Sequence, residues 1–216
     1  HGLFGDVDGD LTVSNLNLFA TTIIGSRSSS ANVGTLAGRV DDDFVANNVH
    51  VVAGTFFAGG ESGVLVGEVL EDATVTDSSV YVYRVSFGDD EAALMIGEVD
   101  ENATFTRVSA VALKHELPSD YDKDWGNSDG GGIGGLVGDM TAGGLSVDKA
   151  FIDFGTYENS EADVVSPSVF GGVVGIFGQS SDSYIKNTEV KIDTIGAKDF
   201  GGLVGFQSFS DDYPFE

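Results

Sequence analysis

The chain has 216 residues, with 35 Asp and Glu against 10 Lys and Arg, a formal net charge of -25, and no cysteine. A surface this acidic repels phosphate groups, so nucleic acid and anionic membranes are excluded as partners. The absence of cysteine excludes disulfide bonds and thiolate metal sites. Hydrophobic residues make up 41% of the chain, enough for a core, and no apolar run approaches the ~20 residues of a membrane-spanning helix.

A short hydrophobic block bracketed by glycines recurs along the whole chain. It reads Gly-Gly-Leu-Val-Gly at residues 134–138 and 201–205, and Gly-Gly-Val-Val-Gly at residues 171–175. Intervals of 29 to 41 residues between successive copies are typical of solenoids, in which each repeat forms one coil. Because the repeats run through the whole chain, we expect one domain over residues 1–216. The second glycines of the seven copies are Gly5, Gly38, Gly67, Gly97, Gly138, Gly175 and Gly205.

Each block is followed by an acidic turn and then by an alternating apolar stretch, such as Val80–Val82 or Ile152–Phe154. A period of two is typical of half-buried strands, and helix-length patterns are missing. We predict an all-β fold, a parallel β-solenoid of about six to seven coils, with a strand through each glycine block and a second strand after the turn. The apolar residues that begin the second strands are Val13, Val45, Val75, Phe105, Val147 and Ile185.

The turns are rich in Asp, as in Asp6–Asp10 and Asp41–Asp43. Short Asp side chains suit turns because their oxygens accept hydrogen bonds from nearby backbone amides. If the turns of neighbouring coils stack, their carboxylates lie within a few ångströms of each other, and a cation between them would relieve the repulsion. Plain acidic turns are favoured, with calcium or high salt as a folding condition.

The longest interval contains a loop insertion at residues 114–132. Acids that alternate along a loop can point oxygen ligands at one calcium ion, although Trp125 stands where an EF-hand loop needs glycine. A solvated acidic loop is the alternative. The candidate calcium ligands are Asp120, Asp122, Asp124 and Asp129.

The same insertion holds the only Trp, and Tyr121 and Trp125 are the candidate contacts to a partner. It also contains His115–Glu116, which matches the start of a zinc-protease helix, but Ser119 occupies the place of the second His and Pro118 opposes a helix. No catalytic residue or organic cofactor is predicted, and we expect the protein not to be an enzyme.

The glycine blocks resemble the GLUG motif, Gly-Leu-any residue-Gly, which recurs in bacterial surface proteins and adhesin-like repeats. Residues 135–138 and 202–205 match the motif fully, and residues 34–38 and 63–67 keep the flanking glycines. The resemblance implies an extracellular repeat module at the cell surface, without a reaction of its own.

We therefore expect a structural and adhesive module of a cell-surface adhesin or filament that contacts a protein or glycan partner. One alternative is a fibre subunit that joins copies head to tail, because uncapped solenoid ends expose unpaired strand edges. A further alternative is a polysaccharide-binding or polysaccharide-cleaving β-helix. The chain opens inside a block at His1, so we expect it to be part of a longer precursor or assembly.

Overall fold

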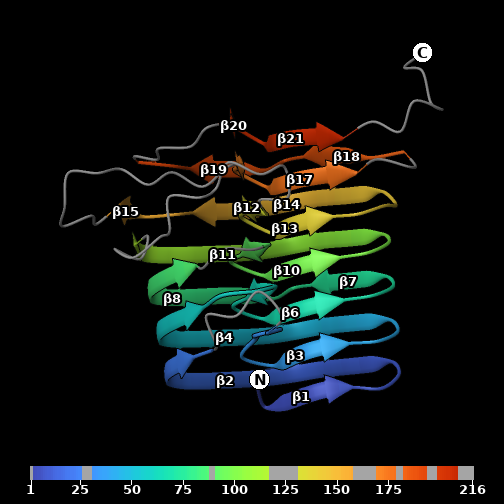
Figure 1. Ribbon diagram of the computed structural model, residues 1–216, viewed down its shortest axis with the longest axis vertical. Helices are drawn as coiled ribbons and strands as arrows, with labels where there is room; N and C mark the ends of the chain where they lie inside the picture. The colour runs from blue at the N-terminus through green and yellow to red at the C-terminus, as the bar shows by residue number, and fades with distance from the viewer. Residues whose placement is uncertain are drawn as a thin grey trace.

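The protein is a stack of β-strand coils (Figure 1). The computed structural model describes residues 2–25, 31–87, 91–116, 131–157, 169–178, 182–193 and 199–208. Among these residues there is no helix, so none that could cross a membrane. Every strand pair is parallel, and the strands form three sheets that run along the stack. This confirms the predicted parallel β-solenoid.

Sheet A takes one strand from each glycine block. Its central register row joins Ala37, Val66, Ile96 and Val137, so equivalent positions of successive blocks lie side by side. All seven second glycines named above lie on this sheet. Its strands are β1 (Phe4–Val7), β3 (Ala37–Val40), β6 (Val66–Val69), β10 (Ile96–Val99), β13 (Val137–Met140), β17 (Val174–Gly178) and β21 (Val204–Ser208).

Sheet B follows the acidic turns and contains the long strands. Val80 and Val82 are buried while Tyr81 and Tyr83 between and after them are exposed, which confirms the predicted alternation. Its strands are β2 (Leu11–Ile24), β4 (Phe44–Ala58), β7 (Ala73–Thr76), β8 (Ser79–Phe87), β11 (Ala103–Glu116), β14 (Leu145–Asp153), β15 (Thr156–Tyr157), β18 (Tyr184–Lys186) and β19 (Glu189–Lys191).

Sheet C consists of short strands that precede those of sheet A: β5 (Ser62–Gly63), β9 (Ala92–Ala93), β12 (Gly132–Gly134), β16 (Val169–Gly171) and β20 (Asp199–Gly201). The prediction of one strand through each glycine block is therefore wrong for these blocks. The chain bends over two residues, Val64–Leu65 between β5 and β6, and the two halves of the block enter different sheets.

The glycines of sheet A allow sheet C to lie directly against it. A Cβ atom on Gly97 would lie 2.5 Å from the carbonyl oxygen of Gly67 and 2.5 Å from the amide nitrogen of Ser62. On Gly138 it would lie 2.4 Å from the amide nitrogen of Ala92. Because all these atoms are backbone, only a residue without a side chain fits, which is why the glycine recurs.

Five turns of the described chain place a strand in all three sheets, beginning at β3, β6, β10, β13 and β17. The expected number of six to seven coils is slightly too high. The seven glycine blocks count the strands of sheet A, and the blocks nearest the two ends do not each add a complete turn. The turn that begins at β1, before these five, is incomplete. It has an isolated bridge between Val33 and Ser62 in place of a sheet C strand.

The register corrects one predicted core residue. Ala46, and not Val45, pairs with Val13 and Val75, while Val45 pairs with Thr12 and Thr74 on the outward side. Ala46 lies eight residues after its glycine, as Val13 and Val75 do after theirs, so the spacing identifies the inward position better than hydrophobicity does.

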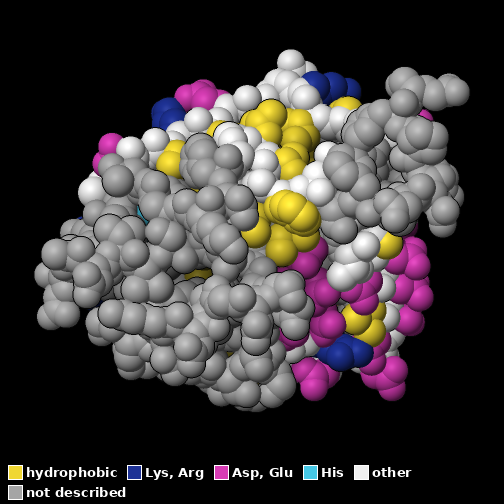
Figure 2. Space-filling view, turned by 45° about the horizontal axis from the view of Figure 1, so that its top comes forward, with side chains coloured by type: hydrophobic (Ala, Val, Ile, Leu, Met, Phe, Trp, Pro, Cys, Tyr) yellow, Lys and Arg dark blue, Asp and Glu magenta, His cyan; other side chains and the backbone are white. Residues whose placement is uncertain are grey.

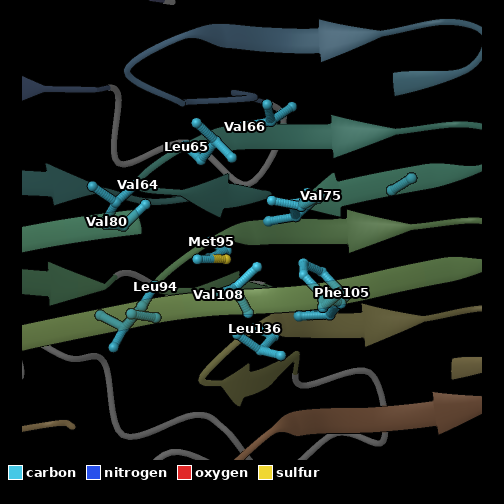
Figure 3. Close-up of a cluster of buried hydrophobic side chains, with 14 of the residues drawn as sticks. Val64, Leu65, Val66, Val75, Val80, Leu94, Met95, Phe105, Val108 and Leu136 are labelled. Atoms are coloured by element: carbon cyan, nitrogen blue, oxygen red, sulfur yellow. The ribbon is translucent and has the colours of Figure 1, made fainter. Parts of the chain in front are cut away.

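The core lies between the sheets and consists of side chains stacked from coil to coil. Leu65, Leu94 and Leu136 at the bends of the glycine blocks are buried, and so are Val75 and Phe105 of sheet B (Figure 3). Stacking of like positions gives each coil the same apolar contacts as the next, which is how a solenoid builds a continuous core from short repeats.

One residue in each rung of sheet B has a left-handed backbone, where a rung is the sheet B part of one coil. These residues are Asn15, Asn48, Asp77, Arg107, Lys149 and Asn187, with φ between 50° and 63°. They bend the rung at the same position in every coil, just after the first stretch of strand. Four of the six are Asn or Asp, which tolerate this conformation better than other side chains.

Candidate functional site

The residues proposed from the insertion lie outside the described part of the chain. The structure shortens that insertion, because Lys114–Glu116 belong to β11 and Gly132 begins β12. His115 and Glu116 lie on a strand and not on a helix, which agrees with the rejection of a zinc-protease motif. The residues outside the described ranges are Asp120, Tyr121, Asp122, Asp124, Trp125 and Asp129.

The acidic turns link neighbouring coils. The Asp43 carboxylate accepts the Asp72 N–H at 3.3 Å, the Asp72 carboxylate accepts the Asn102 N–H at 3.0 Å, and Asn102 Oδ1 accepts the Gly144 N–H at 2.9 Å. The predicted amide bonds therefore form, but they run to the next coil and not within one turn. Turn acids thus hold the register of the stack.

Carboxylates accumulate along this side of the stack, where Figure 2 shows Asp and Glu side chains gathered toward the right. The pKa of the Glu71 carboxyl is raised, through desolvation and through the nearby acids Asp42, Asp43 and Glu101. Glu71 remains exposed to water, so its repulsion is screened. These turns form a solvated acidic edge.

A second acidic group is half-buried where sheets A and C meet. Carboxylate oxygens of Glu61, Glu91 and Glu98 lie within 4.8 Å of one another. Three oxygens at this separation could face one hard cation. Acidic side chains reach such separations without an ion, so the distance alone does not define a metal site.

The Glu98 carboxyl is electrostatically strained. Burial raises the pKa of its carboxyl to about 9, and the neighbouring acids Asp100, Glu91 and Asp139 add to the shift. At neutral pH the folded protein therefore holds Glu98 mainly in its protonated form.

Its neighbour in the previous coil, Glu68, is better compensated. The Arg39 guanidinium lies 3.5 Å from a Glu68 carboxylate oxygen, and Asn32 donates a hydrogen bond to the same carboxylate. Burial still raises the pKa of Glu68, against the opposing effect of Arg39. Glu68 and Glu98 occupy equivalent positions on adjacent strands of sheet A. Glu68 is paired with Arg39, whereas Glu98 is protonated.

The outer face of sheet B is chemically different. We call its first four rungs the neutral platform: the outward-facing side chains of residues 12–21, 45–54, 74–83 and 104–113, which lie on or between β2, β4, β7, β8 and β11. These four stretches contain one acid, Asp77, and one Lys or Arg, Arg107, in a chain with 35 acids.

Those two charges neutralise each other. Arg107 donates to Asp77 twice, from Nη2 to Oδ2 at 2.7 Å and from Nε to Oδ1 at 2.5 Å. The paired guanidinium lowers the pKa of Asp77, so the pair stays ionised over the neutral range. In addition, the His50 ring is held between Ser79 Oγ at 2.8 Å and Asn48 Oδ1 at 3.0 Å.

Apolar and aromatic side chains form a row across the neutral platform. Phe19 pairs with Val52, Val52 with Tyr81, and Tyr81 with Val111. A second, shorter row joins Tyr83 and Leu113, because the residues on either side of them are paired. Apart from the half-buried Val111, all of these side chains are exposed, from 39% for Val52 and Tyr81 to 80% for Phe19.

The neutral character ends at both margins of the platform. The next rung, β14, places Asp148, Lys149 and Asp153 at the equivalent positions. Beyond Tyr83 and Leu113 along the strands come Arg84 and Lys114, both half-buried, and Lys114 Nζ lies over the Tyr83 ring at 5.7 Å from its centre. The platform is therefore a bounded patch and not a property of the whole sheet.

Comparison of the chain with protein-family models, with curated proteins and with solved structures gives no match in any of the three. The candidate sites therefore depend on the geometry of this chain alone.

Neither the neutral platform nor the group of Glu61, Glu91 and Glu98 was predicted from the sequence. The platform has a visible signal, since residues 11–24 and 44–58 contain no Asp or Glu in a strongly acidic chain. The acidic group has none, because its members come together only through the bend that separates sheet C from sheet A.

Proposed function

We propose that this protein is a non-catalytic structural and adhesive repeat module that works outside the cell and contacts its partner through the neutral platform. Its resemblance to GLUG-motif surface proteins points to the same role, and we propose membership of that group. The observation that carries the proposal is the largely exposed row from Phe19 to Val111 on a parallel sheet. Exposed apolar patches framed by polar groups mark interaction surfaces.

The solenoid supports this role mechanically. Successive coils are hydrogen-bonded through their backbones, and several also through turn side chains, so the outward side chains keep fixed spacings. A surface that is already ordered loses little conformational entropy on contact with a partner.

A bead-retention assay tests the proposal. Beads coated with the protein are passed over surfaces that carry either proteins or polysaccharides, and retention is compared with beads coated with albumin. We expect retention on at least one surface, with no release of reducing ends from the polysaccharides. Retention no greater than for albumin on every surface would contradict an adhesive role.

A fibre subunit is the second candidate, and the unpaired edge of β2 favours it. Within the described chain, β2 has a neighbouring strand on one side only. Its inward side chains Leu16 and Leu18 are half-buried, whereas Val49 and Val51 in the next rung are buried. A second copy stacked on this edge would bury them and complete the backbone hydrogen bonds.

Sedimentation velocity and electron microscopy test the second candidate. We expect concentration-dependent growth of particles, and Leu18→Lys should prevent it by placing a charge at the contact. A protein that stays monomeric at every concentration would rule out head-to-tail assembly.

A further inference from the structure

Charge is distributed so unevenly over this protein that the neutral platform selects against charged partners. The turns and sheet A hold carboxylates in every coil from β1 to β13, whereas residues 12–21, 45–54, 74–83 and 104–113 hold one paired acid. An anionic partner is repelled by the net charge of -25, and a cationic partner is attracted to the acidic turns instead. An uncharged partner is the one that this face suits best.

The row from Phe19 to Val111 has the shape of an elongated site. Its four members lie on four adjacent rungs, so the row crosses the strands and extends about 14 Å at ~4.8 Å per rung. Tyr83 lies two residues from Tyr81 on the same strand, which places the two rings side by side, roughly 7 Å apart. Flat apolar rings in this arrangement fit the C–H faces of a chain of sugar rings.

Hydroxyl, amide and imidazole groups run beside the row, in the register column of Asn17, His50, Ser79 and Ser109. Such side chains both donate and accept hydrogen bonds, and so do sugar hydroxyls. His50 and Ser79 already bond to each other, but an apolar protein partner would cover the Asn17 and Ser109 side chains without offering them hydrogen bonds, at a cost in free energy. Interleaved rings and hydroxyl groups therefore favour carbohydrate over a hydrophobic protein surface.

We propose that the neutral platform binds an uncharged polysaccharide laid across the rungs, with Tyr81 and Tyr83 stacking against sugar rings. This inference rests on the proposed adhesive function and specifies the class of its partner. The ligand is a neutral glycan and not an acidic one, because the acidic edge borders the platform.

Affinity electrophoresis tests the inference, since a protein of charge -25 migrates readily in a native gel. The probes are dextran, mannan and a soluble β-glucan as neutral polysaccharides, and alginate as an acidic one. We expect at least one neutral polysaccharide to retard the protein. Tyr81→Ala/Tyr83→Ala should weaken that binding about tenfold, and Tyr81→Phe/Tyr83→Phe should retain most of it, because the rings provide the contact.

Tyr184→Ala is the matched control, because Tyr184 is a tyrosine as exposed as Tyr83 but lies on β18, outside the platform. It should bind like the wild type, and urea unfolding should show that all variants are folded. Retardation by alginate alone, or equal loss in the Tyr184 variant, would overturn the inference.

Two outcomes separate this inference from the function on which it rests. If no neutral polysaccharide retards the protein but beads are retained on a protein-coated surface, the glycan inference is wrong and the adhesive function stands. If beads are retained on no surface, both are wrong.

Discussion

Sheets A and B of the solenoid differ in what lies against their faces. One face of sheet A is covered by sheet C, which lies so close that positions such as Gly97 and Gly138 cannot carry a side chain. On the outer side of sheet B no other strand of the described chain lies over the exposed row, and there the same stacking presents Phe19, Tyr81 and Tyr83 to solvent. Regular repetition thus gives sheet A a tightly covered glycine face and sheet B an open, neutral one.

The largest difference should appear between two phenylalanines on opposite sides of sheet B. Phe105 is fully buried and stacks between Val75 and Val147, whereas Phe19 is 80% exposed. Phe105→Ala should lower the free energy of unfolding by about 3–5 kcal/mol, because it leaves a cavity in the core. Phe19→Ala should change it by less than about 0.5 kcal/mol. Urea unfolding measures both, and similar losses would show that Phe19 is not on an open face.

Two glycines test the close contact between sheets A and C. Gly97→Ala should cost about 1–3 kcal/mol or more, since the new Cβ meets backbone atoms of both sheets and neither can rotate away. Gly5→Ala is the matched control, because nothing lies within 4 Å of the Cβ position there. Thermal unfolding followed by circular dichroism compares them. Equal melting temperatures would mean that the sheets can separate at little cost.

The electrostatic strain at Glu98 predicts a dependence of stability on pH. Its pKa is about 9 in the folded protein against an ordinary value of 4.5, so ionisation is less favourable in the folded state than in the unfolded chain. This group therefore destabilises the fold progressively as pH rises from about 4.5 to about 9 and has no such effect below that window.

Glu98→Gln removes this penalty and should stabilise the protein by about 1–3 kcal/mol at pH 7, with little effect at pH 4. Urea unfolding at several pH values measures the difference. Glu189→Gln, at an exposed position on β19, is the control and should shift stability by less than about 0.5 kcal/mol at either pH. A gain at pH 4 as large as that at pH 7 would contradict the protonation of Glu98.

The smallest effect concerns the left-handed residues that bend the rungs. Asn48 has a φ of 56°, and its side chain donates to Asn15 at 2.8 Å. Asn48→Ala and Asn48→Gly both lose this bond, but Ala also bears the strain of the left-handed backbone, about 1 kcal/mol more than Gly. Equal denaturation midpoints for the two variants would show that the bend relaxes without strain.

The periodicity of the sequence made the solenoid architecture predictable, whereas the geometry within one repeat could not be predicted. Glycine spacing and alternation fix the stacking of equivalent positions, so the parallel solenoid and the residues of sheet A follow from the sequence. The bend at Val64–Leu65 does not, because a Gly-Val-Leu-Val-Gly segment is equally compatible with one straight strand. Without that bend, the approach of Glu61 to Glu98 cannot be foreseen.

The residues with a left-handed backbone were not predicted, although the sequence contains a signal for them. Asn15, Asn48 and Asp77 recur at the repeat spacing, and Asn and Asp are common at such positions. Arg107 and Lys149 in the following coils hide the pattern, since side chain type gives no hint of φ there. The neutral platform was similarly obscured, because knowing which residues face outward requires the register of all four rungs.

The matching segments Gly67–Thr76 and Gly97–Thr106 have a consequence for how such a molecule can change in length. The 30 residues from Gly67 to Gly97 form one turn, after which the chain occupies the equivalent position one step along the axis. Removal or duplication of this interval therefore leaves the remaining turns in register. Unequal recombination between the two segments would therefore yield a shorter or longer rod that still folds. Tyr81 and Tyr83 lie within that interval, so each duplication would add another pair of rings to the open side.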